Sequence, residues 1–272
     1  MKNEPKKVAL VTGASAGMGK DFCLRLIREG YVVYGAARRT NLMAEISAEG
    51  GHVLAMDVTD EGSMVRGVAE LLQAEGRIDV LVNNAGYGAY GAIEDVPLSE
   101  ARRQFEVNVF GLARLTQLVL PQMRLQRSGH IVNISSVGGK IYSPLGGWYH
   151  ATKHALEGFS DCLRFETRGF GIKVVVIEPG GVETEWSGIA ANSAERYSSK
   201  SAYADLAAAW SKLVMRVKGA KPSVISDLLI KAVRSRNPRT RYVGGAASHL
   251  SLFLRFVLTD KLFDGALGLL VR

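Results

Sequence analysis

The chain lacks the features that mark several special classes of protein. Its 272 residues contain only two cysteines, Cys23 and Cys162, which are far apart and provide no disulfide framework. Both fall in helical patterns, so we expect small buried apolar side chains in a reducing compartment. No internal repeat, low-complexity tract or linker stands out, and we expect no metal site.

A targeting segment is also missing from the sequence pattern. Lys2, Lys6 and Lys7 precede an apolar run as in a signal peptide, but the run is only five residues long. We therefore expect a cytoplasmic protein. The formal net charge of +8 suggests nucleic acid as a possible partner. However, the basic residues are scattered along the chain and form no stripe with aromatic residues, as a nucleic-acid-binding surface would. A solvated surface that attracts an anionic ligand is the favoured explanation.

Alternating strand and helix patterns run from Lys7 to about Val243. They predict one α/β domain over residues 1–272, with a doubly wound parallel sheet and helices on both faces. The seven expected strands are Val8–Val11, Val32–Ala36, Val53–Met56, Val80–Val82, Ile131–Ile134, Val174–Ile177 and Arg241–Val243.

A glycine-rich loop follows the first expected strand directly. It contains Gly13, Ser15, Gly17, Met18 and Gly19 and leads into a helical pattern. Glycines permit a tight turn and let a pyrophosphate approach the backbone, where a helix N-terminus offers free N–H groups. The alternative is a glycine turn that merely closes the βα unit.

The second expected strand ends in Arg38 and Arg39 and has no acidic residue there. In dinucleotide-binding folds an acid at this position binds the ribose 2′-OH of NAD, whereas an arginine accommodates the 2′-phosphate of NADP. The pattern favours NADP(H). The alternative is that both arginines are ordinary surface charges.

Tyr149 and Lys153 lie four residues apart, on one face of an expected helix. A nearby positive charge lowers the pKa of a phenol and brings it closer to the range in which acid–base catalysis works. Alone, the pair is weak evidence for a catalytic site, because a packed tyrosine and a solvent-exposed lysine can have the same spacing by chance.

Taken together, the motifs resemble those of the short-chain dehydrogenase/reductase family over nearly the whole chain. The matching positions are Gly13, Ser15, Gly17, Met18, Gly19, Asp57, Val58, Asn84, Ala85, Gly86, Asn108, Ser136, Tyr149, Lys153, Pro179, Gly180, Val182 and Thr184. The resemblance implies that Asp57 and Val58 face the adenine. It also implies that Asn84, Ala85 and Gly86 stabilise the sheet beside the cofactor, and that Pro179 to Thr184 hold the nicotinamide.

The resemblance also implies a mechanism. Hydride passes between nicotinamide and substrate carbon, Tyr149 exchanges a proton with the substrate oxygen, and Ser136 hydrogen-bonds that oxygen. Lys153 is implied to lower the Tyr149 pKa and bind the ribose, and Asn108 to hold a water in a proton relay. Two alternatives stay open: Ser135 in place of Ser136, and Asn108 as a helix-kink residue.

Substrate specificity is expected to come from residues 184–221, beyond the carboxyl ends of the strands. An apolar helix face there contains Leu206 and Trp210, and Trp148 and Trp186 lie near expected loop ends. An apolar lid predicts a small lipophilic carbonyl or alcohol substrate, of steroid, retinoid, fatty or acyl-glycerone type. Simple packing of this face on the domain is the equal alternative.

The stretch from His249 to Arg272 is amphipathic and interrupted by charges, so it predicts no membrane span. We expect it to pack within the fold or at a dimer interface; contact with a membrane surface is possible but not favoured. The tail and the arginine pair resemble the NADP-linked hydroxysteroid, retinol and acyl-dihydroxyacetone-phosphate reductase branch. The family implies a homodimer or homotetramer. A nucleotide-sensing regulator on the same fold and a membrane-surface scaffold remain alternatives.

Overall fold

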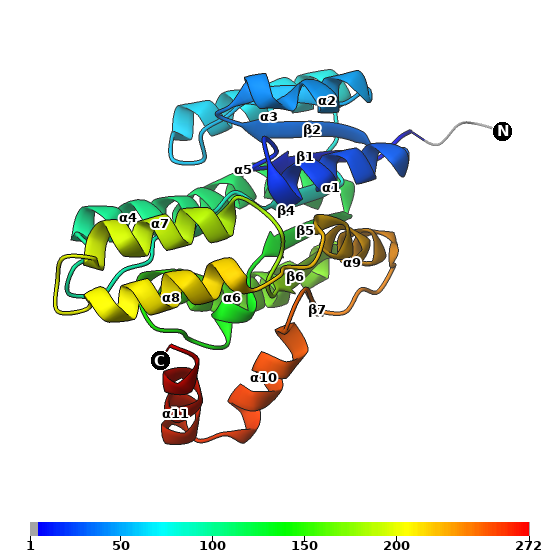
Figure 1. The fold of residues 1–272 in the computed structure, drawn as a ribbon. Helices are drawn as coiled ribbons and strands as arrows, with labels where there is room; N and C mark the ends of the chain where they lie inside the picture. Colours follow the sequence, from blue (N-terminus) through cyan, green and yellow to red (C-terminus); the bar gives the residue numbers. More distant parts are fainter. Residues whose placement is uncertain (1–4, 272) are drawn as a thin grey trace.

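The computed structural model describes residues 5–271. Lys2 of the N-terminal basic group and Arg272 of the predicted extension lie outside the described residues. Seven parallel strands form one sheet in the order β3-β2-β1-β4-β5-β6-β7 (Figure 1). They are β1 (Val8–Thr12), β2 (Val32–Ala37), β3 (His52–Ala55), β4 (Val80–Asn83), β5 (Gly129–Ile134), β6 (Ile172–Pro179) and β7 (Arg241–Gly244). The seven-stranded parallel sheet that the sequence predicts is confirmed, with differences of one or two residues at strand ends.

Helices cover both faces of the sheet. The α-helices are α1 (Gly17–Arg28), α2 (Ala44–Ala48), α3 (Glu61–Glu75), α4 (Leu98–Phe105), α5 (Gly111–Gln126), α6 (Gly147–Thr167), α7 (Trp186–Ser198), α8 (Ala204–Arg216), α9 (Pro222–Arg234), α10 (Ser248–Val257) and α11 (Asp260–Leu270). Four short helical turns complete the fold: η1 (Thr40–Met43), η2 (Glu106–Phe110), η3 (Val137–Gly139) and η4 (Arg168–Phe170).

Two apolar cores lie on opposite faces of the sheet. On one face Phe22 of α1 and Leu229 of α9 pack with alternate residues of the central strands, and α1 contacts α9. On the other face Leu71 of α3, Leu115 of α5 and Leu163 of α6 pack on the remaining strand residues. Every residue of β1 is buried, as expected for a strand covered on both sides.

The strand order reverses between β1 and β4. The chain leaves β1 toward β2 and β3 on one side and returns at β4 on the other, so the loops after β1 and β4 diverge at this point. In open parallel sheets this switch point is where ligands bind, beyond the carboxyl ends of the strands. The glycine-rich loop after β1 and Asn84, Ala85 and Gly86 after β4 meet here.

The two predicted segments beyond the sheet have different structures. Residues 184–221 include α7 and α8, which pack against each other beside the carboxyl edge of the sheet. The C-terminal stretch forms α10 and α11, a hooked pair that projects from the β7 end of the molecule (Figure 1). Within the described residues, no helix is long and apolar enough to cross a membrane.

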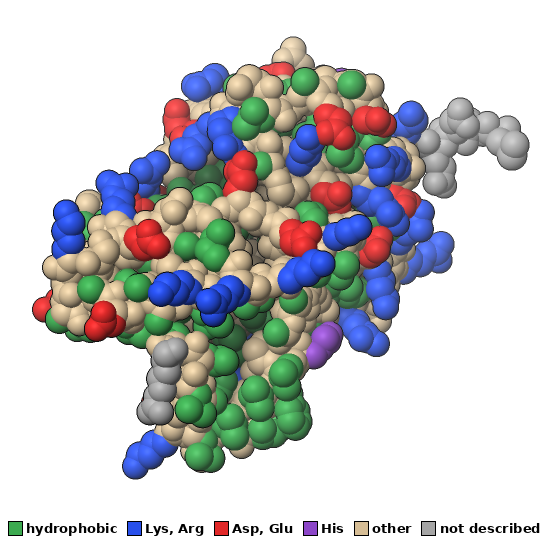
Figure 2. Space-filling view, viewed as in Figure 1, with side chains coloured by type: hydrophobic (Ala, Val, Ile, Leu, Met, Phe, Trp, Pro, Cys, Tyr) green, Lys and Arg blue, Asp and Glu red, His purple; other side chains and the backbone are tan. Residues whose placement is uncertain are grey.

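One expectation about burial is wrong. Cys162 is exposed on α6, although Cys23 is buried, because helical periodicity alone did not show which face of α6 meets the sheet. The C-terminal segment is not packed into the fold over most of its length, and its expected place at a dimer interface stays a prediction. Phe263 is the one large apolar side chain of α10 and α11 that is buried among the described residues. The space-filling view shows the apolar surface that results (Figure 2).

Candidate active site

A cavity of about 490 Å³ opens at the switch point between β1 and β4. Twelve of the predicted cofactor residues line it: Gly13, Ser15, Gly17, Met18, Arg38, Arg39, Asp57, Val58, Asn84, Ala85, Gly86 and Thr184. Residues from the first four strands therefore converge on one wall, as parallel strands ending at the same edge require.

The glycine loop has the backbone shape that a phosphate group needs. Gly13 and Gly17 have φ values of 68° and 54°, in the left-handed region that favours glycine. Gly19 is not among the residues that line the cavity. A Cβ atom added to Gly19 would lie 2.3 Å from the carbonyl oxygen of Gly13, so only glycine fits this close approach. The following helix, α1, has no side-chain cap and no acidic residue in its first turn. Its N-terminal N–H groups and positive dipole end fit a pyrophosphate.

Hydrogen bonds to Thr12 join the loops after β1 and β4. Its hydroxyl accepts from the backbone N–H groups of Asn84 and Ala85, both at 3.0 Å, and Asn84 Nδ2 donates to the Thr12 carbonyl at 2.9 Å. Asn83 donates to Asn133 Oδ1 at 2.9 Å, inside the sheet. These bonds hold the floor of the cavity rigid.

Basic side chains surround the end of the cavity beside β2. Arg38, Arg39 and Arg103 of α4 all line it, and Arg39 pairs with Glu185 at 3.1 Å. Burial raises the pKa of the Asp57 carboxyl, but hydrogen bonds from Thr59 and the charges of Arg38 and Arg103 outweigh it, so the pKa is lowered. Sequence reasoning missed Arg103, which only the packing of α4 brings to the cavity.

Tyr149, Ser136 and Lys153 come together at the start of α6. Tyr149 is 6% exposed, and the Ser136 hydroxyl lies near enough to its phenol to lower the phenol pKa. Ser136 also donates to the Pro179 carbonyl at 3.3 Å and accepts from Gly138 N at 3.0 Å. The neighbouring Ser135 hydroxyl is buried and has no hydrogen-bond partner among the described residues, and Ser136 is the serine that lies beside Tyr149.

Burial dominates the pKa values of both Tyr149 and Lys153. Burial raises the pKa of Tyr149 to about 12, and the Ser136 hydroxyl acts in the opposite direction. Burial also lowers the pKa of Lys153 to about 8, against the charge of Glu157. Lys153 Nζ donates to the Ile134 carbonyl at 2.8 Å and lies 6.0 Å from the centre of the Tyr149 ring. Burial is therefore the largest effect on the pKa of Tyr149 in this structure, and the lowering of that pKa by Lys153 stays a prediction.

Asn108 lies in a π-helical turn, η2, between α4 and α5. Its Nδ2 donates to the Tyr87 carbonyl at 2.9 Å and to Thr152 Oγ1 at 3.0 Å, and its Oδ1 accepts from Tyr87 N at 3.1 Å. π-Helical turns are frequent at functional sites. Asn108 thus lies in an irregular helical turn. Its hydrogen bonds also connect the loop after β4, through Tyr87, to Thr152 of α6, which directly precedes Lys153.

Aromatic rings cover Tyr149. Tyr90 stacks on Trp210 with ring centres 4.2 Å apart, and Trp186 lies 5.4 Å from Tyr149. Leu206 and Val214 of α8 pack against this cluster. Two of the three predicted tryptophans therefore meet here, and the apolar face of α8 packs on the site. Trp148 is outside the cluster, and its buried indole N–H has no hydrogen-bond partner within residues 5–271.

The remaining predicted residues lie beside the cavity. Val182 forms a bridge with Ala220, and a Cβ on Gly180 would fall 2.4 Å from the Ala246 carbonyl oxygen. His150 was not predicted: its Nδ1 lies 2.9 Å from the Gly138 carbonyl, and its Nε2 accepts from Ser143 N at 3.0 Å. It holds the loop between Ser136 and Tyr149, and its position directly after Tyr149 was the only signal in the sequence.

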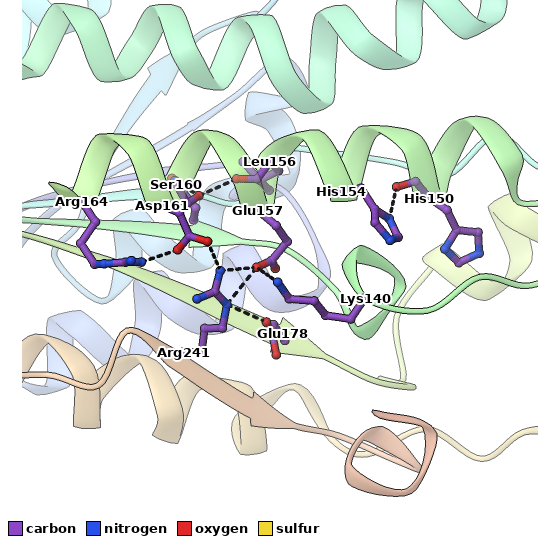
Figure 3. Close-up of polar contacts among 11 residues, drawn as sticks. Lys140, His150, His154, Leu156, Glu157, Ser160, Asp161, Arg164, Glu178 and Arg241 are labelled. Carbon is purple, nitrogen blue, oxygen red and sulfur yellow. Dashed lines mark hydrogen bonds and ion pairs between the residues drawn. The ribbon is translucent and has the colours of Figure 1, made fainter. Parts of the chain in front are cut away.

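A network of charged side chains surrounds the buried Glu157 and Glu178 (Figure 3). Glu157, one helical turn after Lys153, contacts Lys140 at 3.0 Å and Arg241 at 2.9 Å, and Arg241 also contacts Glu178 at 3.2 Å. Burial and the Glu157 charge raise the pKa of Glu178 to about 7, against the charges of Lys140 and Arg241. Asp161 pairs with Arg241 at 2.8 Å. The network joins α6, β6 and β7 to the turn that follows Ser136.

The fold and the cavity define a nucleotide-binding oxidoreductase of the Rossmann type. The family model described as short chain dehydrogenase matches residues 7–195. A probable short-chain type dehydrogenase/reductase, VdlC, of Helicobacter pylori is 34% identical over 266 residues, which are 97% of each chain. The chain belongs to the short-chain dehydrogenase/reductase family, whose members transfer hydride at carbonyl or CH–OH groups.

Further relatives are named by their substrates. A 3-ketodihydrosphingosine reductase of Bacteroides thetaiotaomicron is 36% identical over 86% of each chain. An NADPH-dependent 3-dehydrocapnine reductase of Ornithobacterium rhinotracheale is 32% identical over 95% of each chain.

Solved structures agree with the fold. A short-chain dehydrogenase from Streptomyces avermitilis superposes with a TM-score of 0.83 at 33% identity, over 97% of this chain and 95% of that one. A serine dehydrogenase in complex with NADP+ has a TM-score of 0.77 at 27% identity, over 88% and 95%. A Burkholderia phymatum relative in complex with NAD has a TM-score of 0.80 at 25% identity, over 98% and 97%. Similar structures thus bind either dinucleotide.

Proposed function

We propose that this chain is an NADPH-dependent reductase of a lipophilic ketone or aldehyde, with Tyr149 as the acid–base group. The observation that carries the proposal is the buried Tyr149 side chain, which lies beside the Ser136 hydroxyl and packs against Trp186, a residue that lines the cavity. When bound, the nicotinamide supplies the hydride. The glycine loop and the open N-terminus of α1 would hold the pyrophosphate.

Three arginines favour NADP(H) over NAD(H) in this proposal. Arg38, Arg39 and Arg103 gather at the end of the cavity where the family holds the adenosine ribose, and a 2′-phosphate has two more negative charges to place there. The NADPH-dependent relative supports the same choice.

Tyr149 suits proton donation in the direction of reduction. Because burial keeps its pKa at about 12, the phenol is protonated at neutral pH and can give its proton to an oxygen that gains negative charge. Ser136 would hydrogen-bond the same oxygen and orient it. Lys153 would contact the nicotinamide ribose, and Asn108 would hold the loop after β4 in place and support a water beside Lys153.

The aromatic cluster of Tyr90, Trp186 and Trp210 supports a lipophilic substrate. It offers an apolar wall next to the Tyr149 phenol, where polar sugars would lose hydrogen bonds. The two relatives named as reductases of 3-ketodihydrosphingosine and 3-dehydrocapnine favour a long-chain ketone among the lipophilic candidates.

The test is the loss of NADPH absorbance with ketones and aldehydes that range from small polar compounds to steroids, retinal and long-chain 3-ketones. We expect turnover with apolar compounds and a loss of at least about a thousandfold in Tyr149→Phe, with NADPH binding unchanged. Retained turnover in Tyr149→Phe would remove Tyr149 as the acid. Tight NADPH binding without turnover on any compound would favour the nucleotide-sensing alternative.

A further inference from the structure

The C-terminal helices present an apolar surface to solvent. Seven large apolar side chains of α10 and α11 are between 49% and 88% exposed: Leu250, Phe253, Phe256, Val257, Leu262, Leu269 and Leu270. Exposed apolar residues that stand alone are normal, whereas a contiguous group of this kind marks an interaction site. Figure 2 shows them gathered at one end of the molecule.

The surface is fixed in position by its inner side. Phe263 of α11 is buried against Tyr142, with ring centres 5.1 Å apart, and the Tyr142 hydroxyl donates to Asp264 at 2.7 Å. Arg255 of α10 pairs with Asp260 of α11 at 3.0 Å, which joins the two helices. The hook, which consists of α10 and α11, is therefore anchored to the loop before Tyr149. Its apolar outer face is held in a fixed position by the fold.

Four exposed cations line the adjacent edge, where Glu183 is an acidic neighbour of Lys218. Between residues 206 and 226 the chain has Lys212, Arg216, Lys218 and Lys221, all exposed, and no aspartate or glutamate. Val217, within this run, lies beside Gly181 and Ala246, directly before α10. Figure 2 shows lysine and arginine side chains on the body of the molecule above the apolar end.

We propose that the outer face of α10 and α11, with the cationic edge of α8, docks on the surface of an anionic lipid bilayer. The charge pattern favours this occupant. Phosphate headgroups complement the exposed side chains of Lys212, Arg216 and Lys218 beside the apolar face. Helices of 10 and 11 residues are too short to cross a bilayer but fit its interface, where the phenylalanines reach the acyl boundary.

Docking would bring the bilayer to the active site. Val271, directly after α11, packs against the aromatic cluster of Tyr90, Trp186 and Trp210 that covers Tyr149. The membrane face and the apolar wall of the site are thus neighbours, so a lipid-dissolved ketone would reach Tyr149 with little exposure to water. Membrane docking does not depend on the proposed reaction and is tested without turnover.

The experiment is flotation of the full chain with vesicles of phosphatidylcholine alone or with 30% phosphatidylglycerol, about a third of the lipid as in anionic bilayers. We expect flotation with the anionic vesicles that falls with salt. Phe253→Ser with Phe256→Ser should reduce the bound fraction on the order of tenfold, because two rings leave the interface. Lys212→Gln with Arg216→Gln and Lys218→Gln should reduce binding to anionic vesicles only.

The matched control is Leu125→Ser with Phe165→Ser, which removes two side chains that are 80% and 63% exposed outside the hook. This variant should float like the unaltered chain. Thermal melting confirms that each variant is folded. No flotation, or equal loss in the control variant, would overturn the proposal. Light scattering that shows a dimer lost in the Phe253 and Phe256 variant, without vesicle binding, would identify a contact between copies instead.

Discussion

Replacing Glu178 by glutamine should remove a pH dependence of stability that the buried charge network creates. Glu178 and Glu157 are 3% and 5% exposed at their side chains and face each other across Arg241. Burial and the Glu157 charge raise the Glu178 pKa from its ordinary 4.5 to about 7. At about 1.4 kcal/mol per pKa unit, this corresponds to about 3 kcal/mol of unfolding free energy.

The direction follows from where the proton is held. Below pH 4.5 the Glu178 carboxyl is protonated in both the folded and the unfolded chain, so the stability is fully present. Between pH 4.5 and about 7 the unfolded chain releases the proton and the folded chain keeps it. The free energy of unfolding therefore falls as pH rises, and the full amount is lost once pH exceeds about 7.

Glutamine has the shape of the protonated carboxyl and does not titrate. Urea unfolding of the unaltered chain and Glu178→Gln, followed by circular dichroism from about pH 5 to about pH 9 at one protein concentration, measures the effect. We expect the variant to gain about 3 kcal/mol relative to the unaltered chain across this range. Glu61→Gln, a carboxyl 67% exposed on α3, is the control and should give a flat difference. Parallel curves for Glu178→Gln and the unaltered chain would refute the reasoning.

Three further changes test the cavity. Ala37→Asp with Arg38→Ala should shift preference from NADPH toward NADH, because an acid repels the 2′-phosphate and accepts from a ribose hydroxyl; an unchanged ratio of dissociation constants, measured by fluorescence, would contradict the NADP(H) assignment. Trp210→Ala removes the ring stacked 4.2 Å from Tyr90 and should raise KM for bulky ketones more than for small ones; equal changes would mean that α8 only packs. Gly19→Ala places a Cβ 2.3 Å from the Gly13 carbonyl oxygen and should weaken dinucleotide binding about tenfold or more, while Gly158→Ala, with nothing within 4 Å, should leave titrations unchanged.

The cofactor half of the site could be predicted because its signals are local. A strand, a glycine turn and a helix lie within about twenty residues, and parallel strands must end at one edge of the sheet. Gly13, Gly17 and Asn84 therefore meet as expected. Periodicity likewise predicted all seven strands, because buried parallel strands are continuous apolar runs.

Residues far apart in sequence could not be placed in this way. Arg241 meets Glu157 across 84 positions, and Trp210 stacks on Tyr90, neither of which a local pattern encodes. A helical periodicity shows that one face of a helix is apolar, but it does not show which part of the protein, if any, packs on that face. The predicted burial of Cys162 was wrong for this reason. The amphipathic pattern of the C-terminal segment likewise did not show that most of its apolar side chains lie outside the fold of this chain.

The sequence by itself determined the class of fold, the order of the strands and helices along the chain, and the glycine loop, since strand and helix periodicity and backbone freedom are local properties. Only the tertiary structure decided the proton affinity of Tyr149. A neighbouring lysine lowers a phenol pKa and burial raises it, and burial depends on Tyr90 and Trp186 arriving from other segments. The exposure of the α10 and α11 apolar face was decided in the same way, because it depends on which surfaces the rest of the fold leaves uncovered.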